Sequence, residues 1–285
     1  MSSLKLIRHI DSLTDISDIM SAMKYLSIME SNKLSRYILH QKRTMQSIEL
    51  ATQDFLHFHP KLLGKIEPKL HIIVVLGSER GFCGNYNESL YQSVEDYLNV
   101  QQNPDLEIKI VTLGYKLHHK FEKNTQLHKE LSGPKLAEEI PNVISKLIRS
   151  ISHMLDNHQA SQLTVIHHSE ESPHPIFRKI LPTFETLASH TYSTPPQTHL
   201  SNKTLFYSLL DEYLFASLNQ VFYAAFMSEN QYRIRHMENS LNKLSEKITA
   251  LSLKRNEIRQ EEITEELEVI MLSSNVIDNV QEKQL

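Results

Sequence analysis

The sequence predicts a small α/β domain flanked by two long terminal helices, which pair with each other as an antiparallel coiled coil. The 6 glycines all lie from Gly64 to Gly133, and the 10 prolines all lie from Pro60 to Pro196. Both ends of the 285-residue chain are therefore free of the two residues that most disfavour a helix. The middle alternates short apolar runs with helical patterns, which is typical of an α/β domain.

The first segment, residues 3–58, is predicted to form one helix that ends at His59-Pro60. Its apolar residues recur at spacings of three and four, which places them in one stripe along the helix. The predicted members of this stripe are Leu6, Ile10, Leu13, Ile16, Met20, Met23 and Leu26.

The last segment, residues 205–280, is predicted to form a second long helix. A coiled-coil seam with steps of four and three runs through Met237, Leu241, Leu244, Ile248, Leu251 and Ile258. The register then drifts through Ile263, Leu267 and Ile270. A lone amphipathic helix is marginal in water, so this one needs a partner. The first helix is the obvious candidate, and the pair runs antiparallel if the middle domain sits at one end.

The middle segment is predicted to hold three strands, at residues 71–76, 107–113 and 162–167. Amphipathic helices fit around residues 88–98 and 134–155. Strands that alternate with helices favour a largely parallel sheet. We therefore divide the chain into an N-terminal helix (1–60), an α/β domain (69–196) and a C-terminal helix (203–285), with residues 193–196 as the second linker.

Composition excludes some classes of function. The formal net charge of -4 is close to balance, so it gives no strong case for nucleic acid as a partner. The first residues have neither the apolar stretch of a signal peptide nor the Arg-rich pattern of a transit segment. No apolar run approaches the length of roughly 20 residues that crosses a bilayer. We expect a soluble protein that associates with membranes only through partners.

A glycine-containing turn, residues 78–84, follows the first predicted strand and precedes a helix. Such turns often bind phosphate, but the glycine spacing here is neither GxGxxG nor that of a P-loop. We therefore favour a tight turn in which glycine supplies a positive φ. The single cysteine, Cys83, excludes an intramolecular disulfide and could be a nucleophile, because a helix N-terminus lowers a thiol pKa. A structural role is favoured, since no Cys-His spacing supports catalysis.

The sixteen histidines raise the question of a metal site. His118-His119 and His167-His168 are adjacent pairs, and adjacent residues on a strand point to opposite faces. The sequence contains neither His-Glu-x-x-His nor paired-cysteine spacing. We interpret these histidines as surface or packing residues, and we expect no metal and no cofactor.

Charge is segregated along the last helix. A basic stretch that ends at Arg259 is followed by Glu261, Glu262, Glu265, Glu266 and Glu268, and the next basic residue is Lys283. A solvated face mixes the signs more evenly, so the two stretches indicate different surroundings, although solvation alone could also explain them.

Three blocks of sequence resemble the gamma subunits of F-type ATP synthases. The turn, with Glu79, Arg80, Gly81, Cys83, Gly84 and, three positions on, Asn87, is similar to the signature turn of that family. Ile10-x-Ser12-Leu13 with Ile19-x-x-Ala22-Met23 resembles its N-terminal helix. Asn256-x-x-Arg259-Gln260-x-x-Ile263-Thr264-x-Glu266-Leu267 resembles its C-terminal signature, and Ser228-Glu229, Arg233 and Met237 fit the stretch that precedes that signature. The blocks occur in the family's order and span the chain.

The resemblance implies a non-catalytic rotor shaft that couples ion flow through a membrane c-ring to ATP synthesis or hydrolysis. The implied partners are three alpha and three beta subunits, the epsilon subunit and the c-ring, at the cytoplasmic face of a bacterial inner membrane. Arg259 and Gln260 correspond to a polar pair that contacts a beta-subunit loop, and Thr264 and Glu266 belong to the same block. Ala22-Met23 corresponds to the facing position on the first helix, where Met23 could equally serve in seam packing alone.

The sequence departs from the family at several positions. Asp18 and Glu30 stand where lysine is usual, Asn85 replaces a second glycine, and residues 273–275 replace a small-residue tip. These departures indicate a divergent member of the family. Two alternatives remain: a coiled-coil scaffold without an ATPase partner, and an enzyme that uses Cys83 or the Gly81 loop on a phosphorylated substrate. Neither explains three ordered blocks.

Overall fold

The computed structural model describes residues 3–62, 69–101, 106–155, 161–181 and 197–281. The predicted linker at residues 193–196 lies outside these ranges. The chain forms two compact units, one of Met1–Tyr25 with Met237–Leu285 and one of Leu26–His236. Each long helix contributes to both units. The division into three domains at 1–60, 69–196 and 203–285 stays a prediction.

The two long helices are present where the sequence predicts them. Helix α1 spans Ser3–Phe58 and ends just before His59-Pro60, and α5 spans Asn202–Gln281. The boundary at Phe58 follows from proline, which disfavours helical backbone in the residue before it.

The unit that contains both chain ends corrects the predicted stripe of α1. Ile16, which we expected in the stripe, is 46% exposed, and Leu26, also expected there but the first residue of the other unit, is 57% exposed. In residues 3–25 the buried or half-buried row instead runs through Leu6, Ile10, Leu13, Ser17, Met20 and Lys24. These positions are spaced alternately by four and three residues, which is the heptad repeat. The predicted stripe instead included Ile16, which is apolar but lies one position away from this repeat.

On α5 the positions of the predicted seam form a buried row in the same unit, and their pairing as a coiled coil stays a prediction. All six predicted residues from Met237 to Ile258 are buried or half-buried, whereas Ile263, Leu267 and Ile270 are exposed. The Lys24 ammonium lies 3.9 Å from the Glu238 carboxylate. This ion pair links α1 and α5 close to the residues at which the unit is bounded, Tyr25 and Met237.

The second unit contains a five-stranded sheet in the order β3-β2-β1-β4-β5. The first four strands are parallel, and β5 is antiparallel to β4, so the predicted largely parallel sheet is confirmed. Its strands are β1 (Leu70–Leu76), β2 (Glu107–Leu113), β3 (Leu127–Leu131), β4 (Ser161–Ser169) and β5 (Ser172–Leu181). Its helices are α2 (Tyr86–Val100), α3 (Tyr115–Phe121) and α4 (Ile140–Leu155), and short 3-10 turns occupy Pro60–Leu62 and Ala137–Glu139.

Three elements were not predicted: α3, β3 and β5. Strand β3 reads Leu-His-Lys-Glu-Leu, so its only apolar residues are the first and the last. Strand β5 begins with Ser-Pro-His-Pro, which is not typical of a strand. Both lie at the edges of the sheet, where polar residues and proline are tolerated because one side of the strand needs no pairing.

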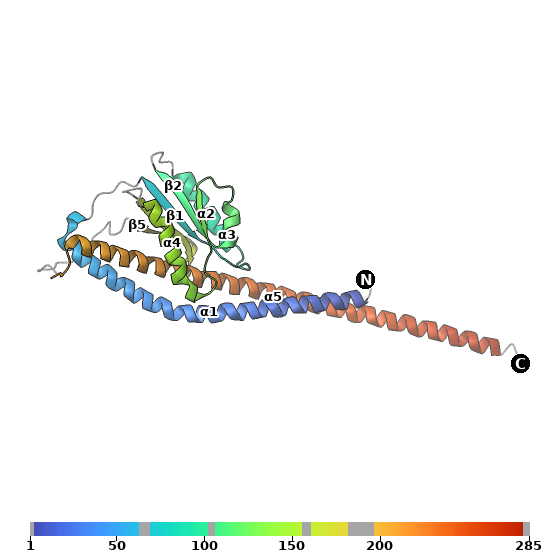
Figure 1. Cartoon of the computed structure of the whole chain (residues 1–285). Coiled ribbons are helices and arrows are strands. Elements are labelled where there is room, and N and C mark those ends of the chain that lie inside the picture. The colour runs from blue at the N-terminus through green and yellow to red at the C-terminus, as the bar shows by residue number, and fades with distance from the viewer. Residues whose placement is uncertain (1–2, 63–68, 102–105, 156–160, 182–196, 282–285) are drawn as a thin grey trace. The chain divides into compact units, whose positions relative to one another are not determined.

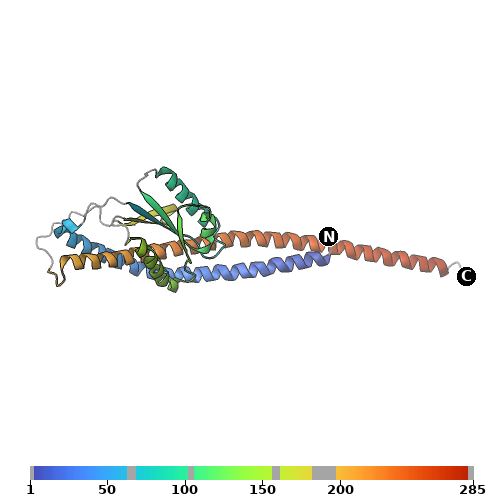
Figure 2. The ribbon, with the colours of Figure 1, turned by 45° about the horizontal axis from the view of Figure 1, so that its top comes forward.

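Helices lie on both faces of the sheet (Figures 1 and 2), and each face has its own core. One face packs against α4 and the middle of α5, with Leu34 of α1 at its margin. The other face packs against α2 and α3. Strand β1 is buried along its whole length, because it lies at the centre of the sheet and contributes alternate residues to both cores.

In this second unit, α1 and α5 run in opposite directions. The rings of Tyr37 and Tyr223 stack with centroids 5.6 Å apart. Further along α1, the Met45 sulfur accepts a hydrogen bond of 3.7 Å from the Ser217 hydroxyl, at an earlier position on α5. The partner on α5 therefore moves backward as α1 moves forward.

Two histidines are fully buried in the sheet region. His71 on β1 shares a hydrogen bond of 2.9 Å between its Nε2 and the Thr164 hydroxyl. Burial, helped by the charge of Lys179, lowers the pKa of His71 to about 4. Burial likewise lowers the pKa of His168 to about 4. Both histidines are neutral in the folded protein at neutral pH.

Acid should therefore destabilise the fold between about pH 6.5 and pH 4. The unfolded chain binds a proton at His71 below its ordinary pKa, whereas the folded chain does not until about pH 4. The free energy of unfolding is therefore highest above the ordinary histidine pKa of 6.5, and it decreases as the pH falls from there toward the folded-state pKa of about 4. Between pH 7.5 and 5.5, His71 alone should lower the free energy of unfolding by about 1.4 kcal/mol. Urea unfolding of His71→Gln at both values should show a change smaller by that amount.

His174→Gln is the matched control for this measurement, because His174 is exposed on β5. It should keep the pH dependence of the wild type. An unchanged pH dependence in His71→Gln would contradict the interpretation.

Candidate functional site: the turn after the first strand and the exposed end of α5

The turn that joins β1 to α2 is closed by two hydrogen bonds between Ser78 at its start and Asn87 beyond its end. The backbone N–H of Ser78 donates to the Asn87 amide oxygen at 3.0 Å, and the Asn87 amide nitrogen donates to the Ser78 hydroxyl at 2.8 Å. Asn87, predicted as a signature residue, therefore fixes the start of the turn from the first turn of α2.

Glu79 and Arg80 connect this turn to the loops after the neighbouring strands. One Glu79 carboxylate oxygen accepts from the backbone N–H of Tyr115 at 3.1 Å and of Gly133 at 2.9 Å. The Arg80 guanidinium donates to the Lys135 carbonyl at 3.0 Å. Because these loops follow β2 and β3, the turn is held to three adjacent strand ends.

The backbone of the turn confirms part of the glycine prediction. Gly84 has a φ of +58°, as a tight turn requires, but the second left-handed residue is Phe82, with a φ of +64°, and not Gly81. A non-glycine residue in this region costs about 1–2 kcal/mol. The Phe82 side chain is half exposed, so packing of its ring does not fully offset that cost.

Helix α5 contributes a charged pair that contacts the turn from inside the protein. Arg233, which is 1% exposed, forms an ion pair with Glu229 one helical turn earlier. Its guanidinium also donates to the Gly81 carbonyl at 3.3 Å, to the Cys83 sulfur at 3.1 Å and to the Asn230 amide oxygen at 3.0 Å. One side chain therefore joins α5 to two residues of the turn.

Burial determines the protonation of this cluster. It raises the pKa of Cys83 to about 11, although the positive charge of Arg233 opposes that shift. Burial also raises the pKa of Glu229, again opposed by Arg233. For Arg233, burial lowers the pKa, but Glu229 and Cys83 more than offset it, so the net pKa is raised. Cys83 is thus a buried neutral thiol in a structural role and is unsuited to nucleophilic catalysis.

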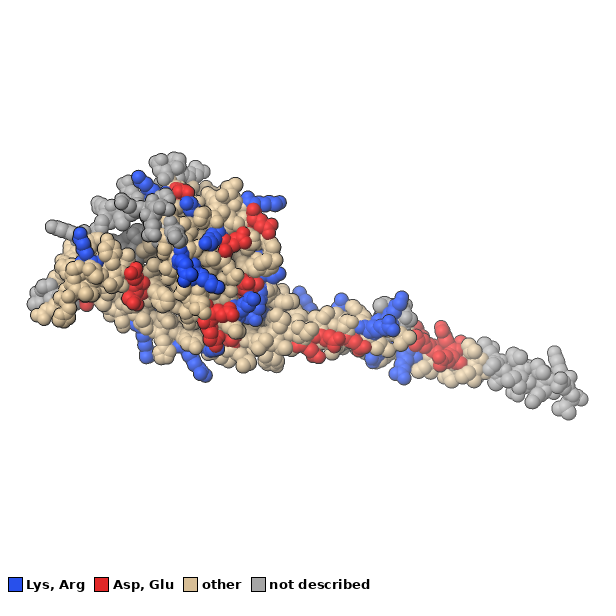
Figure 3. All heavy atoms as spheres, in the orientation of Figure 1, with Lys and Arg blue, Asp and Glu red and all other residues tan. Residues whose placement is uncertain are grey.

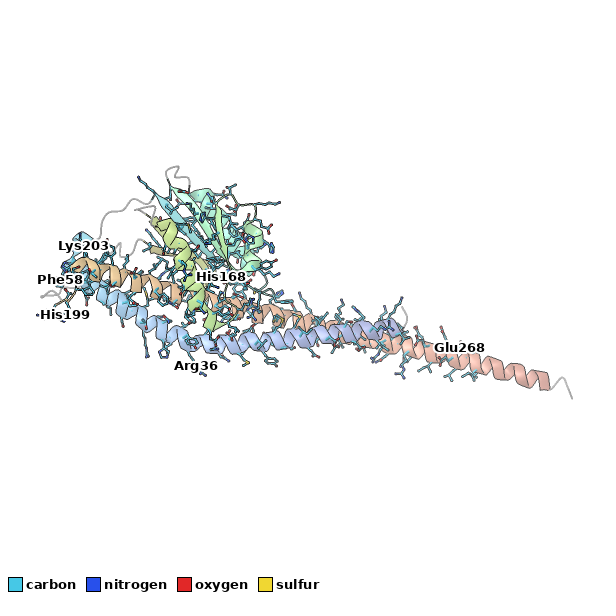
Figure 4. All side chains as sticks on the ribbon, viewed as in Figure 1. Arg36, Phe58, His168, His199, Lys203 and Glu268 are labelled. Carbon is cyan, nitrogen blue, oxygen red and sulfur yellow. The ribbon has the colours of Figure 1, made fainter. Side chains whose placement is uncertain are left out.

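Aromatic side chains surround the same junction. The Tyr86 hydroxyl donates to the Ala225 carbonyl of α5 at 3.3 Å and lies 3.4 Å from the Leu76 carbonyl. His168, labelled in Figure 4, packs against the rings of Tyr86 and Tyr232, with centroids 4.6 and 5.0 Å away. Its Nε2 hydrogen-bonds the Ser89 hydroxyl at 2.8 Å. The packing role expected for His167-His168 is confirmed for this pair, which is buried.

At the ends of the central strands, α5 fills the space that a phosphate would need. A cavity of about 10 Å³, roughly the size of one water, remains there between Gly77, Tyr86, Phe226 and Glu229. A larger hollow of about 370 Å³ lies outside the turn, beside Lys116 and Lys120. Lys120 is ion-paired there with Glu88. This arrangement gives the enzyme alternative no enclosed site at the turn.

Elsewhere in the described residues, no three His, Cys, Asp or Glu side chains are placed to share a metal ion. His118 and His119 lie on α3 and not on a strand, because a short helix fits between β2 and β3. No helix in the described ranges is both long and apolar enough to cross a membrane.

The remaining predicted site residues lie on the two terminal helices. Ala22 is exposed and Met23 is half-buried on α1. Arg259, Gln260, Thr264 and Glu266 are exposed on α5, where the Thr264 hydroxyl donates to the Gln260 backbone carbonyl at 2.8 Å. The structure thus brings together the turn residues, and it leaves the α5 residues on an open helical surface.

Glu30, which stands where the family usually has lysine, caps a backbone N–H group of a neighbouring segment. Its carboxylate accepts from the backbone N–H of Ala137 at 3.2 Å, at the start of the 3-10 turn that leads into α4. The neighbouring Lys33 pairs with Glu138 in the same turn. An acidic residue suits this position because the N-terminus of a helix carries unpaired N–H groups.

Tyr86 and His168 were not predicted as site residues, and Glu229 and Arg233 were matched to the family's sequence without a predicted role. A sequence signal for the charged pair does exist. Glu229 and Arg233 are spaced i,i+4 directly after an apolar run at residues 221–227, and no glycine or proline interrupts it. Opposite charges at that spacing pair on one helix face. That the face is buried follows only from the packing.

The fold and the turn define a class of protein in which an α/β domain packs against long terminal helices and is hydrogen-bonded to one of them through a buried arginine. Comparisons with known proteins name the family. Residues 3–275 match the family model described as ATP synthase. The chain belongs to the ATP synthase gamma-chain family.

Among its relatives is the ATP synthase gamma chain of Rickettsia prowazekii (strain Madrid E), 25% identical over 297 residues, covering 97% of this chain and 100% of the relative. The ATP synthase gamma chain of Buchnera aphidicola subsp. Diuraphis noxia is 24% identical over 293 residues, covering 97% and 99%.

Solved structures share the fold. A chain of the Euglena gracilis mitochondrial ATP synthase (OSCP/F1/c-ring, rotational state 3) aligns with a TM-score of 0.63 and 14% identity, over 96% of this chain and 94% of that one. A chain of the Tetrahymena thermophila mitochondrial ATP synthase central stalk/c-ring aligns with a TM-score of 0.57 and 15% identity, over 78% and 99%. The predicted family is confirmed, and the scaffold alternative receives no support.

The buried pair generates a stability prediction. Arg233→Met leaves the Glu229 carboxylate buried without its partner, so it should lower the free energy of unfolding by about 3–5 kcal/mol. The double variant Glu229→Leu with Arg233→Met replaces both charges by apolar groups of similar length and should lose much less. Urea unfolding at pH 7.5 measures both.

Arg235→Met is the matched control, because the exposed Arg235 lies over the Tyr232 ring at 4.7 Å and makes a surface contact of about 0.5–1 kcal/mol. A double variant as unstable as Arg233→Met would show that the charges themselves hold this part of the fold together.

Proposed function

We propose that this chain is the central rotor shaft of an F-type ATP synthase. It couples ion flow through a membrane c-ring to ATP synthesis or hydrolysis in a head of alpha and beta subunits. The observation that carries the proposal is the extent of the family match, which includes both long helices as well as the α/β domain. The chain itself holds no catalytic role in this proposal, and the nucleotide sites belong to its partners.

Within the unit formed by the chain ends, we infer an antiparallel coiled coil. The buried rows on α1 and α5 both step by four and three, which is the spacing of a coiled-coil seam. From residue 259 to residue 271 the α5 surface is exposed, and this stretch is the part of the shaft that would enter the cavity of the alpha/beta head.

The proposed mechanism depends on asymmetry. One shaft cannot contact three identical beta subunits in the same way, so each rotor angle favours a different conformation at each nucleotide site. The difference in contact free energy is what couples rotor angle to nucleotide affinity. Coupling therefore requires side chains on the shaft that reach the head directly.

The exposed end of α5 supplies such side chains. Figure 3 shows lysines and arginines gathered along this helix, followed by a cluster of acidic residues. The cluster consists of Glu261, Glu262, Glu265, Glu266 and Glu268. We propose that Arg259 and Gln260, at the boundary, contact a beta-subunit loop, because the planar donor fork of arginine binds carboxylates or carbonyls at two points. Ala22 and Met23 are proposed as the facing contact on α1, and Thr264 and Glu266 as part of the same interface.

We further propose a location at the cytoplasmic face of a bacterial inner membrane, with three alpha and three beta subunits, an epsilon subunit and the c-ring as partners. The bacterial relatives support this setting. Attachment to the membrane would then be indirect, through the c-ring.

Native mass spectrometry of the chain, co-expressed with the alpha and beta subunits of its own organism, tests the function. We expect one copy for every three alpha and three beta subunits, and ATPase activity that disappears when the chain is omitted. A chain that stays free or self-associates while alpha and beta assemble without it would overturn the proposal.

The double variant Arg259→Ala with Gln260→Ala should lower the coupled ATPase turnover of the assembled complex about fivefold, which corresponds to the loss of about 1 kcal/mol. Both residues are exposed in the chain, so its thermal unfolding should not change. Asn242→Ala with Lys243→Ala is the matched control, since it removes an adjacent amide and cation from the same helix. Equal turnover in the two double variants would exclude a special role for Arg259 and Gln260.

A further inference from the structure

We propose that Arg233 is a positioning residue whose guanidinium fastens α5 to the turn after β1, so that the α/β domain rotates with the shaft instead of slipping around it. The inference rests on the proposed rotor function and deepens it, because it names the contact through which α5 carries its domain.

The geometry of Arg233 suits a fastening contact. Its guanidinium donates in two directions, to Glu229 and Asn230 on its own helix and to Gly81 and Cys83 on the turn. A planar fork with fixed donor directions can satisfy all four acceptors only at one rotation and one height of α5 relative to the turn. The contact therefore specifies the register between the helix and the domain.

The other contacts of this part of α5 are mostly apolar and specify register less well. Leu218, Val221, Phe222 and Phe226 pack against the sheet in its first core. Hydrophobic contact is non-directional, so a small rotation of α5 would exchange one apolar neighbour for another at low cost. Directional bonds to the domain occur at the end of this patch, where Tyr86 donates to the Ala225 carbonyl, and beyond it, where Gln231 donates to Glu170.

The turn on the receiving side is itself firmly held. Glu79 binds the loops after β2 and β3 through two backbone N–H groups, and Arg80 binds the Lys135 carbonyl. A force on Gly81 or Cys83 is therefore passed to three strand ends and not absorbed by one flexible loop. The conformation at Phe82, with its positive φ, lies between the two residues that Arg233 contacts.

Stability alone does not require this pair. Buried ion pairs can often be replaced by apolar residues of similar size without loss of stability, and some are retained because they select one arrangement over close alternatives. Here the alternatives are neighbouring rotations of α5 against the same apolar face. An apolar pair would keep the fold but would not select among them.

The experiment compares ATP hydrolysis with ATP-driven ion pumping in vesicles that contain the whole reconstituted complex. The test variant is Glu229→Leu with Arg233→Met, which removes the fork without leaving a buried charge. We expect hydrolysis to stay within twofold of the wild type, while the ratio of ions pumped to ATP hydrolysed falls at least threefold. Arg235→Met, two residues along α5 and exposed, should keep the wild-type ratio.

A second variant separates the fork from its charge. Arg233→Lys keeps an ion pair with Glu229, but a single ammonium cannot bond Gly81 and Cys83 as the fork does. Its ratio should also fall. A wild-type ratio in either variant, including a proportional loss of both hydrolysis and pumping, would overturn the inference. If instead the wild-type chain supports no pumping at all, the rotor function itself is what fails.

Discussion

The middle of α5 must satisfy two different surfaces along one stretch of helix. Leu218 and Phe222 pack against the sheet, whereas Ser217 and Tyr223 contact α1. A helix that is covered on two sides becomes apolar around most of its circumference, and residues 216–230 of α5 are nearly all buried. The α/β domain and the paired helices therefore depend on the same segment, and neither could form its observed core without it.

That segment of α5 ends in the charged residues Glu229 and Arg233 because different parts of the α/β domain pack against the helix there. Up to Phe226 the neighbours are the apolar residues of the sheet, and from Glu229 onward they are the backbone and thiol of the turn. Backbone carbonyls require donors, and an arginine supplies several from one side chain. Burial of that positive charge in turn requires the Glu229 carboxylate. The pair, the turn and the end of the sheet thus form one polar junction beside two apolar cores.

The same arrangement explains why an α/β sheet of a type that often binds nucleotides serves as a structural domain here. Ligands of such sheets bind at the carboxyl ends of the strands. In this chain α5 occupies that position, and the glycine-containing turn closes over an arginine from the protein itself. The buried thiol agrees with the structural role of this domain and with the family to which the chain belongs.

The sequence by itself determined the elements whose signals are local. The absence of glycine and proline from both ends predicted α1 and α5, and the apolar runs before Gly77 and Gly114 predicted β1 and β2. Only the tertiary structure decided which row of α1 is buried, because Ser17 and Lys24 lie in the seam by position and not by polarity. Only packing decided that Arg233 is buried, since its sequence resembles that of a solvated i,i+4 pair. The turn residues were found by their motif, but their attachment to α5 joins residues about 150 positions apart in the chain, and no local pattern encodes such a contact.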